Sequence, residues 1–210
     1  MKGPLRGFLF DFDGVLSDSL KGAHEGVCNV CRQSGVPEIS FEEFLRTFHA
    51  PYLPCYRKLG VVAPTEDISR WYKEVARHHE ARMFPDALEL TKHLVLEHRS
   101  VIGIITAQRE ALVMDLCWRA GIKNHISYLV GQCEHKDEAI TTFCKRTGIP
   151  IDRTWFFGDM PSDMRDAKLA GVLGVGVTRG NPTKDLLIGA GAIHCIEHLS
   201  EVPALVCCRG

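Results

Sequence analysis

Phe8-Leu9-Phe10-Asp11-Phe12-Asp13-Gly14 is the stretch of this sequence that decides the fold. Its three leading apolar residues predict a short buried strand, which ends in two carboxylates and a glycine that allows a sharp turn. Burying Asp11 and Asp13 without partners would cost several kcal/mol, so a cation, hydrogen-bond donors or water must lie close to them. In an open α/β sheet, ligands collect at the carboxyl ends of the strands. A solvated acidic turn would explain one of these aspartates, but it fits two aspartates flanking a phenylalanine poorly.

The sequence pattern changes twice after this strand. Between residues 17 and 83 four segments show helical spacing, and Ser40 with Glu43 has the form of an N-terminal capping box. From Phe84 onward, helices alternate with short apolar strands, which predicts βαβ units and a parallel sheet. We therefore predict an α/β protein. Its Rossmann-like parallel-sheet core would comprise residues 1–16 and 84–210, and an all-helical domain, residues 17–83, would be inserted after the first strand.

The apolar periodicity and the turn residues also give bounds for the individual elements. Glycine or proline marks the end of most of them. We expect strands at residues 8–10, 100–105, 126–130, 154–157, 172–177 and 192–196, and helices at residues 20–34, 41–48, 56–59, 66–83, 86–97, 109–120, 137–147, 163–170 and 184–188.

Composition limits the class of protein. With 25 basic and 26 acidic residues and no long basic run, the chain is not expected to bind nucleic acid through phosphate neutralisation. No apolar run approaches the length of a membrane span, and we expect no secretory signal. The nine cysteines are odd in number and lie mostly in apolar stretches, which favours reduced thiols and a cytoplasmic location. Cys28 and Cys31 form a CxxC on one face of a predicted helix, and without a second pair they are expected to be packing residues.

Polar side chains follow the ends of three predicted strands, and a lysine precedes a predicted helix. A parallel sheet would bring these groups into one crevice, where several carboxylates would face a single ammonium group. Such an excess of negative charge requires a divalent cation, and an all-oxygen ligand set favours Mg²⁺ over Zn²⁺. Taken singly, the threonine and the last aspartate could be helix caps and the lysine a surface residue. The groups are Asp11, Asp13, Thr106, Lys136, Asp159 and Asp163.

Their order resembles the four motifs of the haloacid dehalogenase superfamily of phosphohydrolases. The motifs are Asp11-Phe-Asp-Gly14, a strand ending in Thr106, Lys136, and Gly158-Asp-Met-Pro-Ser-Asp163. The helical insertion resembles the cap of the phosphoglycolate phosphatase and β-phosphoglucomutase branch, although Ala107-Gln108 follows the threonine where that branch often has asparagine. The resemblance implies a Mg²⁺-dependent phosphatase, a phosphoglycolate phosphatase-like enzyme that acts on a small phosphorylated metabolite as a monomer or homodimer.

The chemistry expected of the first motif follows from its residue types. A carboxylate that attacks a phosphate meets like charge, so a metal and a cation must neutralise the phosphoryl oxygens. Asp11 would be the nucleophile and form an aspartyl-phosphate. Asp13 would protonate the leaving alkoxide and then accept a proton from the attacking water. Lys136 would balance charge in the transition state.

The resemblance also implies the ligands. The metal would be bound by Asp11, by Asp159 and by the backbone carbonyl of Asp13. Asp163 would bind the metal directly or through a water, or would orient Lys136. Thr106 and the backbone N–H of Ala107 would hold phosphoryl oxygens. These residues would handle only the phosphoryl group.

Specificity would be set by the helical insertion, which must meet the rest of the substrate. His49 and Arg57 are the polar residues expected to contact it, although a solvated helix face would explain either one equally well. Two other functions remain open: a phosphomutase of the β-phosphoglucomutase type, and a non-catalytic phosphate-binding regulator. Asp13 and the size of the insertion argue against the regulator.

Overall fold

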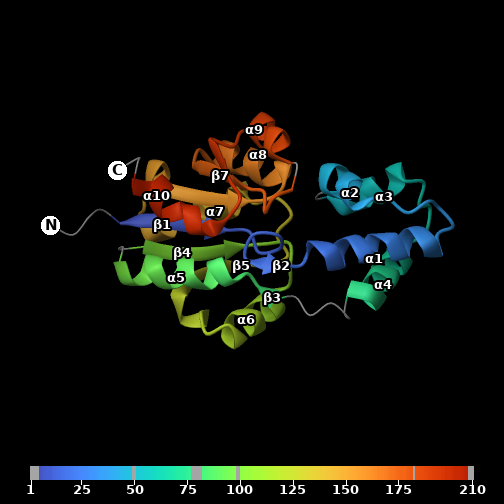
Figure 1. Cartoon of the computed structure of the whole chain (residues 1–210), viewed down its shortest axis with the longest axis horizontal. Coiled ribbons are helices and arrows are strands. Elements are labelled where there is room, and N and C mark those ends of the chain that lie inside the picture. Colours follow the sequence, from blue (N-terminus) through green and yellow to red (C-terminus); the bar gives the residue numbers. More distant parts are fainter. Residues whose placement is uncertain (1–4, 49–50, 77–81, 98–99, 182, 208–210) are drawn as a thin grey trace. The chain divides into compact units, whose positions relative to one another are not determined.

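The computed structural model describes residues 5–48, 51–76, 82–97, 100–181 and 183–207 (Figure 1). The chain divides into two compact units. One comprises Met1–Ser17 and Met83–Gly210, and the other comprises Asp18–Arg82. No described helix combines the length and the apolar composition that crossing a bilayer requires.

The first unit is built on a six-stranded parallel sheet with the order β5-β4-β1-β6-β7-β8. This sheet confirms the predicted α/β class. From β1 the chain continues to β4 and β5 on one side and then to β6, β7 and β8 on the other, so the strand order reverses at β1. In such sheets the reversal point is where ligands bind. The strands are β1 (Arg6–Phe10), β4 (Ser100–Ile105), β5 (Ile126–Val130), β6 (Thr154–Gly158), β7 (Leu173–Val177) and β8 (His194–Ile196).

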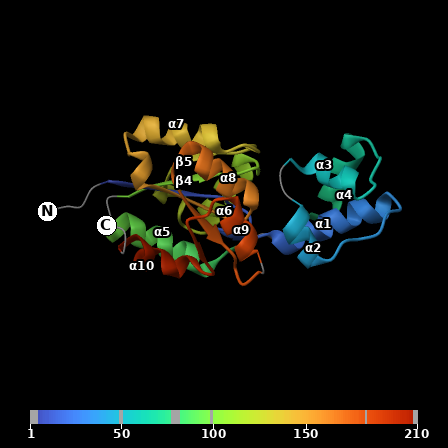
Figure 2. The same ribbon diagram turned by 90° about the horizontal axis from the view of Figure 1, so that it is seen from above.

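Helices cover both faces of this sheet, and Figure 2 shows α7 on one face with α5 and α10 on the other. Leu9 and Phe156 pack with Phe143 of α7 in one buried cluster. Phe10 stacks on Phe157 with ring centroids 4.9 Å apart. Burial on both faces explains why β1 and β6 are almost continuously apolar, since an alternating pattern arises only when one face meets water. The helices are α5 (Pro85–Glu97), α6 (Glu110–Arg119), α7 (Asp137–Thr147), α8 (Pro161–Ala170), α9 (Lys184–Ala190) and α10 (Val202–Cys207).

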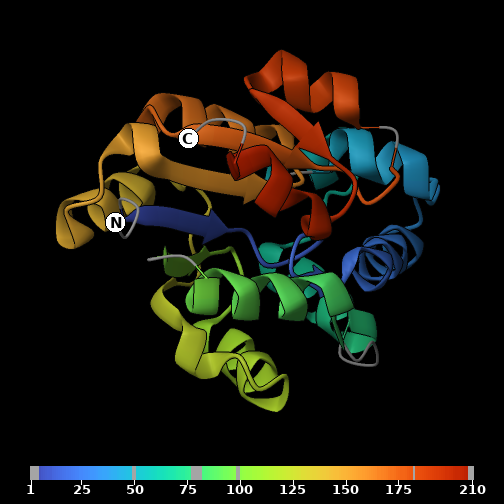
Figure 3. The same cartoon turned by 60° about the vertical axis from the view of Figure 1, so that its left-hand side comes forward.

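Strand β1 lies between β4 and β6 in the sheet. Figure 3 shows β1, the blue arrow, beside the orange strands of the second half of the sheet. The parallel pairing places Phe10 opposite Ile104 of β4 and opposite Phe157 of β6. The three strand ends therefore leave the sheet at the same edge.

Three short 3₁₀ helices complete the first unit. They are Lys123–His125, Ile151–Arg153 and Leu199–Glu201.

The second unit is helical and has its own apolar core, which includes Cys31. Cys28 and Cys31 are both buried free thiols. The Ser40 hydroxyl accepts a hydrogen bond from the Glu43 backbone N–H, which confirms the predicted cap. Two short strands, β2 (Ser17–Asp18) and β3 (Arg82–Met83), pair with each other where the chain passes between the units. The helices are α1 (Leu20–Gln33), α2 (Phe41–Thr47), α3 (Tyr52–Lys58) and α4 (Thr65–Ala76).

Most predicted bounds differ from the observed ones by one or two residues, and in four elements the difference involves a proline. The predicted helix 66–83 was wrong at its end, because Arg82 and Met83 form a strand and Phe84, which precedes Pro85, is disfavoured in a helix. Helices α3 and α8 begin earlier than predicted, and α10 was not predicted. Each carries a proline in its first turn, where the absent N–H would have no helical partner. These prolines are Pro54, Pro161 and Pro203.

Candidate active site

Asp11 lies immediately beyond β1, at the reversal point of the sheet. Its backbone N–H continues the pairing by donating to the Phe157 carbonyl at 2.8 Å, and its Oδ1 accepts the Phe12 N–H at 2.7 Å. The side chain is buried. Gly14 has a φ of +73°, which only glycine adopts without strain, and it turns the chain just after the partly buried Asp13. The fold therefore presents this acidic pair on a tight turn at the edge of the sheet where ligands collect in α/β proteins.

Lys136 brings the positive charge to Asp11. It is the N-cap residue of α7, and its side chain is buried rather than on the surface. Its Nζ lies 2.9 Å from Oδ1 of Asp11 and 2.7 Å from Oδ1 of Asp163. The ammonium group thus joins two carboxylates that are far apart in the sequence.

Asp159 and Asp163 come from the segment that follows β6. Asp163 lies in the first turn of α8, where Oδ2 accepts the Met160 N–H at 3.1 Å while Oδ1 pairs with the lysine. It is therefore both a helix cap and a partner of the buried cation. A Cβ at Gly158 would lie 2.3 Å from Cβ of Asp163, so only glycine allows this close approach.

The three carboxylates of Asp11, Asp159 and Asp163 each offer an oxygen within 4.8 Å of the others. Burial raises the pKa of Asp11 to about 7, with Lys136 opposing this rise and Asp163 adding to it. Burial also raises the pKa of Asp159 well above its usual range, and the two neighbouring carboxylates raise it further. Burial alone would lower the pKa of Lys136, but Asp11 and Asp163 outweigh it and the pKa is raised. One ammonium group is thus too little positive charge for this cluster.

A divalent cation fits the donor set of this cluster. All three side chains offer oxygen ligands, which Mg²⁺ prefers. The oxygens of Asp11, Asp159 and Asp163 lie close enough together for all three to bind one ion. A cation would also supply the charge that burial makes necessary.

Proton competition should make Mg²⁺ binding depend on pH. Because the folded-state pKa of Asp11 is raised to about 7, the contribution of this carboxyl group to the stability of the metal-free protein falls as pH rises from about 4 to about 7. Mg²⁺ must displace that proton below pH 7. We expect the rise in unfolding temperature on adding MgCl₂ to be larger at about pH 8 than at about pH 6. Asp159→Asn should lose most of this rise, and an equal rise at both pH values in the unmodified protein would contradict the assignment.

Thr106 and Ala107 follow β4 at the same edge of the sheet. Thr106 is buried, its N–H donates to the Val130 carbonyl at 2.9 Å, and its Oγ1 accepts the Gln108 N–H at 3.1 Å. Its hydroxyl therefore closes the local turn, and the expected alternative of a helix cap is wrong, because the N-cap residue of α6 is Arg109. Ala107 is half-buried beside it. Phosphoryl binding by this pair stays a prediction.

The two substrate contacts expected in the second unit are less well defined. The Arg57 guanidinium donates from Nη1 to the Val61 carbonyl at 2.7 Å and to the Ala63 carbonyl at 2.9 Å, so it stabilises the loop after α3. His49 lies outside the described residues. Their contact with a substrate stays a prediction.

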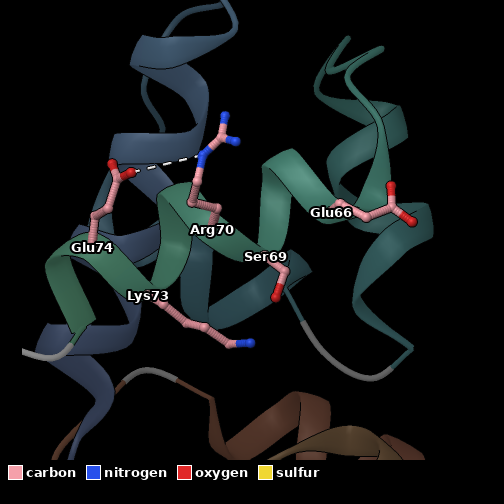
Figure 4. Close-up of a pocket in the computed structure, with 5 residues that line it drawn as sticks. All are labelled: Glu66, Ser69, Arg70, Lys73 and Glu74. Carbon is pink, nitrogen blue, oxygen red and sulfur yellow. Dashed lines mark ion pairs between the residues drawn. The ribbon is translucent and has the colours of Figure 1, made fainter.

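A surface hollow of about 340 Å³ lies on α4 in the second unit (Figure 4). All of its lining residues come from this one helix, and Arg70 pairs there with Glu74 and with Asp67. None of the residues predicted to react or to bind substrate lines it. The lining residues are Glu66, Ser69, Arg70, Lys73 and Glu74.

Asp166 is a residue of the site region that the sequence argument did not identify. Its Oδ2 accepts the backbone N–H of Lys136 at 2.8 Å, and its side chain is buried. It thereby ties α8 to the start of α7. The signal was present in the sequence, because Asp163 and Asp166 are three residues apart and share one face of α8.

Comparisons with known proteins give one family match and several relatives. A family model described as haloacid dehalogenase-like hydrolase matches residues 8–177. The chain is 24% identical over 207 residues to a 5′-nucleotidase of Pseudomonas aeruginosa, covering 92% of each protein. It is 24% identical over 190 residues to a phosphoglycolate phosphatase of Pseudomonas fluorescens, covering 82% of this chain and 69% of that protein. A solved putative haloacid dehalogenase-like hydrolase from Bacteroides fragilis has a TM-score of 0.80 at 21% identity and covers 95% of this chain and 100% of that one.

Proposed function

The chain belongs to the haloacid dehalogenase-like hydrolase family, and we propose that this phosphoric monoester hydrolase acts on a small phosphorylated metabolite with Mg²⁺ as cofactor. The observation that carries the proposal is the buried group of Asp11, Asp159 and Asp163 around Lys136 at the reversal point of the sheet. We propose that Asp11, Asp159, Asp163 and the carbonyl of Asp13 hold the cation. When bound, Mg²⁺ would withdraw charge from the phosphoryl oxygens and keep the carboxylates ionised.

The proposed reaction has two steps. In the first, an oxygen of Asp11 forms a bond to phosphorus while the bond to the leaving alkoxide breaks, and Asp13 gives that alkoxide its proton. In the second, Asp13 takes a proton from a water that attacks phosphorus, which releases phosphate and restores Asp11. The Phe12 N–H and Lys136 Nζ both bond to Oδ1 of Asp11 and so fix the orientation of the nucleophile before attack.

Phosphate release from purified protein tests this proposal. We expect hydrolysis of 4-nitrophenyl phosphate in MgCl₂ and its loss in excess EDTA. Accumulation of an isomeric sugar phosphate in place of free phosphate would indicate a mutase. If no ester in a panel of phosphoglycolate, 5′-nucleotides and sugar phosphates released phosphate, the proposed function would be wrong and a phosphate-binding regulator would remain.

The natural ester has two named candidates, because one relative is a phosphoglycolate phosphatase and another is a 5′-nucleotidase. The nucleotidase aligns over 92% of both proteins, which favours testing nucleotides as fully as phosphoglycolate. The ratio of kcat/KM for phosphoglycolate and for adenosine 5′-phosphate would decide between them. Arg57 and His49 are the proposed contacts to the rest of the substrate.

Replacing Asp13 with asparagine should lower kcat by about 10²- to 10⁴-fold, because the amide can neither donate nor accept the proton as a carboxyl group does. The proposed metal contact of Asp13 is its backbone carbonyl, so the unfolding temperature should still rise on addition of MgCl₂. Steady-state kinetics beside thermal unfolding would check both expectations. Turnover at the rate of the unmodified protein would remove Asp13 from its acid–base role.

We also propose a cytoplasmic location. Eight described cysteines are free thiols, and five of them are buried. Free thiols persist most readily in a reducing compartment.

A further inference from the structure

Arg179 joins separate segments of the first unit beside the turn that carries Asp13. It follows β7, and its side chain is only 8% exposed. Its Nη1 donates to Oδ2 of Asp86 and its Nη2 donates to the backbone carbonyl of Val15, both at 2.5 Å. The guanidinium Cζ lies 3.9 Å from the centroid of the Phe84 ring. Segments that are up to 164 residues apart in the sequence thus meet at one cation.

The partners of Arg179 are themselves held in place. Oδ2 of Asp86 also accepts the Leu199 N–H at 2.8 Å, so the carboxylate is fixed from the C-terminal side as well. Arg179 has a φ of +50°, a left-handed conformation that costs a residue with a Cβ about 1–3 kcal/mol. The surrounding contacts must outweigh that cost. Such strain is typical of functional sites, which indicates a role for the contacts that the guanidinium group makes.

The guanidinium holds the turn between Phe12 and Ser17. Within this turn the N–H groups of Leu16 and Ser17 both donate to the Phe12 carbonyl, at 3.0 and 2.9 Å. The Leu16 carbonyl in turn accepts the Phe84 N–H at 2.9 Å. Arg179 adds the contact to Val15, two residues beyond Asp13. The turn is therefore fixed from outside at two consecutive carbonyls, just after the proposed acid–base residue.

We propose that Arg179 is a positioning residue for Asp13: by holding the Val15 carbonyl against Asp86 and Phe84, it keeps the acid–base carboxyl group in its working place. This inference rests on the proposed function. It differs from a purely structural role, in which loss of the arginine would weaken the fold and affect all substrates alike. The two roles predict different dependences on the leaving group.

The leaving group provides the test because esters differ in how much they need a general acid. A 4-nitrophenolate leaves readily without a proton, whereas an alkoxide needs one. We therefore compare kcat/KM for 4-nitrophenyl phosphate with kcat/KM for phosphoglycolate and adenosine 5′-phosphate, which are alkyl esters. In Arg179→Lys the alkyl-to-aryl ratio should fall by about tenfold or more while kcat/KM for the aryl ester stays within about threefold. Lysine keeps the charge but cannot donate from two nitrogens in one plane.

Three further variants make the result specific. Val206→Ala shortens a buried side chain of α10, and it should lower stability without changing the ratio. Arg179→Met removes both donors and should lower the ratio further. In an Asp13→Asn background, Arg179→Lys should have no further effect on the ratio, because the two changes act on one function.

The outcomes separate this inference from the proposed function. Equal losses on aryl and alkyl esters in Arg179→Lys, or additive effects of Arg179→Lys and Asp13→Asn, would overturn the positioning role while leaving the phosphatase intact. An unmodified protein that hydrolysed none of these esters would overturn the proposed function, and this inference with it. If Arg179→Met does not fold, the ratio in Arg179→Lys decides.

Discussion

Replacing Asp11 with asparagine is expected to lower phosphate release by at least about 10⁴-fold, because the amide oxygen cannot form the phospho-enzyme. The same substitution should not destabilise the metal-free protein. Burial raises the pKa of Asp11 to about 7 and places its carboxylate beside that of Asp163. A neutral amide of the same shape removes this unfavourable charge, so the unfolding temperature without Mg²⁺ should stay equal or rise. Activity should therefore fall without a loss of stability.

Two measurements check the role of Asp11. Acid quenching during turnover should trap one phosphoryl group on the peptide that contains Asp11 in the unmodified protein and none in the variant. Asp115→Asn is the matched control, because Asp115 is an exposed aspartate of α6 in the same unit and pairs only with Arg119 among the described ion pairs. It should keep full activity. More than about 1% residual turnover in Asp11→Asn would assign the nucleophile elsewhere.

Replacing Lys136 with methionine is expected to lower the free energy of unfolding by about 3–5 kcal/mol at neutral pH, because it leaves buried carboxylates without their cation. Lys136 Nζ contacts Asp11 at 2.9 Å and Asp163 at 2.7 Å, and these two carboxylates raise its pKa. A raised lysine pKa means that its contribution to stability is fully present below its unfolded pKa of about 10.4 and is lost only above it. Activity should fall together with stability.

The pH dependence of the Lys136→Met variant distinguishes electrostatics from packing. Toward about pH 5 the buried Asp11 can take up a proton, so the loss of stability should become smaller. MgCl₂ should also restore part of the loss, since it supplies positive charge to the same carboxylates. Urea denaturation at several pH values measures both effects. Lys145→Met, an exposed lysine of α7, serves as the control and should change stability by less than about 0.5 kcal/mol. A loss that did not vary with pH would indicate a packing defect.

Much of the fold was predictable because its signals are local. Patterns among neighbouring residues predicted the strand before Asp11, the strand at 126–130 and the helix at 137–147. The last two elements have the predicted bounds. Helix starts were predicted less well where a proline lies in the first turn, because the effect of proline depends on where the helix begins. Pro54 lies in the first turn of α3, where proline is tolerated, although the helix was predicted to begin only at Tyr56.

The sequence by itself determined the α/β class and the residue types at the ends of the strands, because periodicity, turn residues and carboxylate spacing act over a few positions. Only the tertiary structure decided which of these groups meet. Burial of Lys136 between Asp11 and Asp163, the anchoring of its backbone by Asp166, and the contact of Arg179 with Val15 all join residues between 27 and 164 positions apart. Such contacts follow from the order of strands in the sheet and from the cost of leaving buried charges unpaired. That cost exists only once the chain has folded and excluded water from around them.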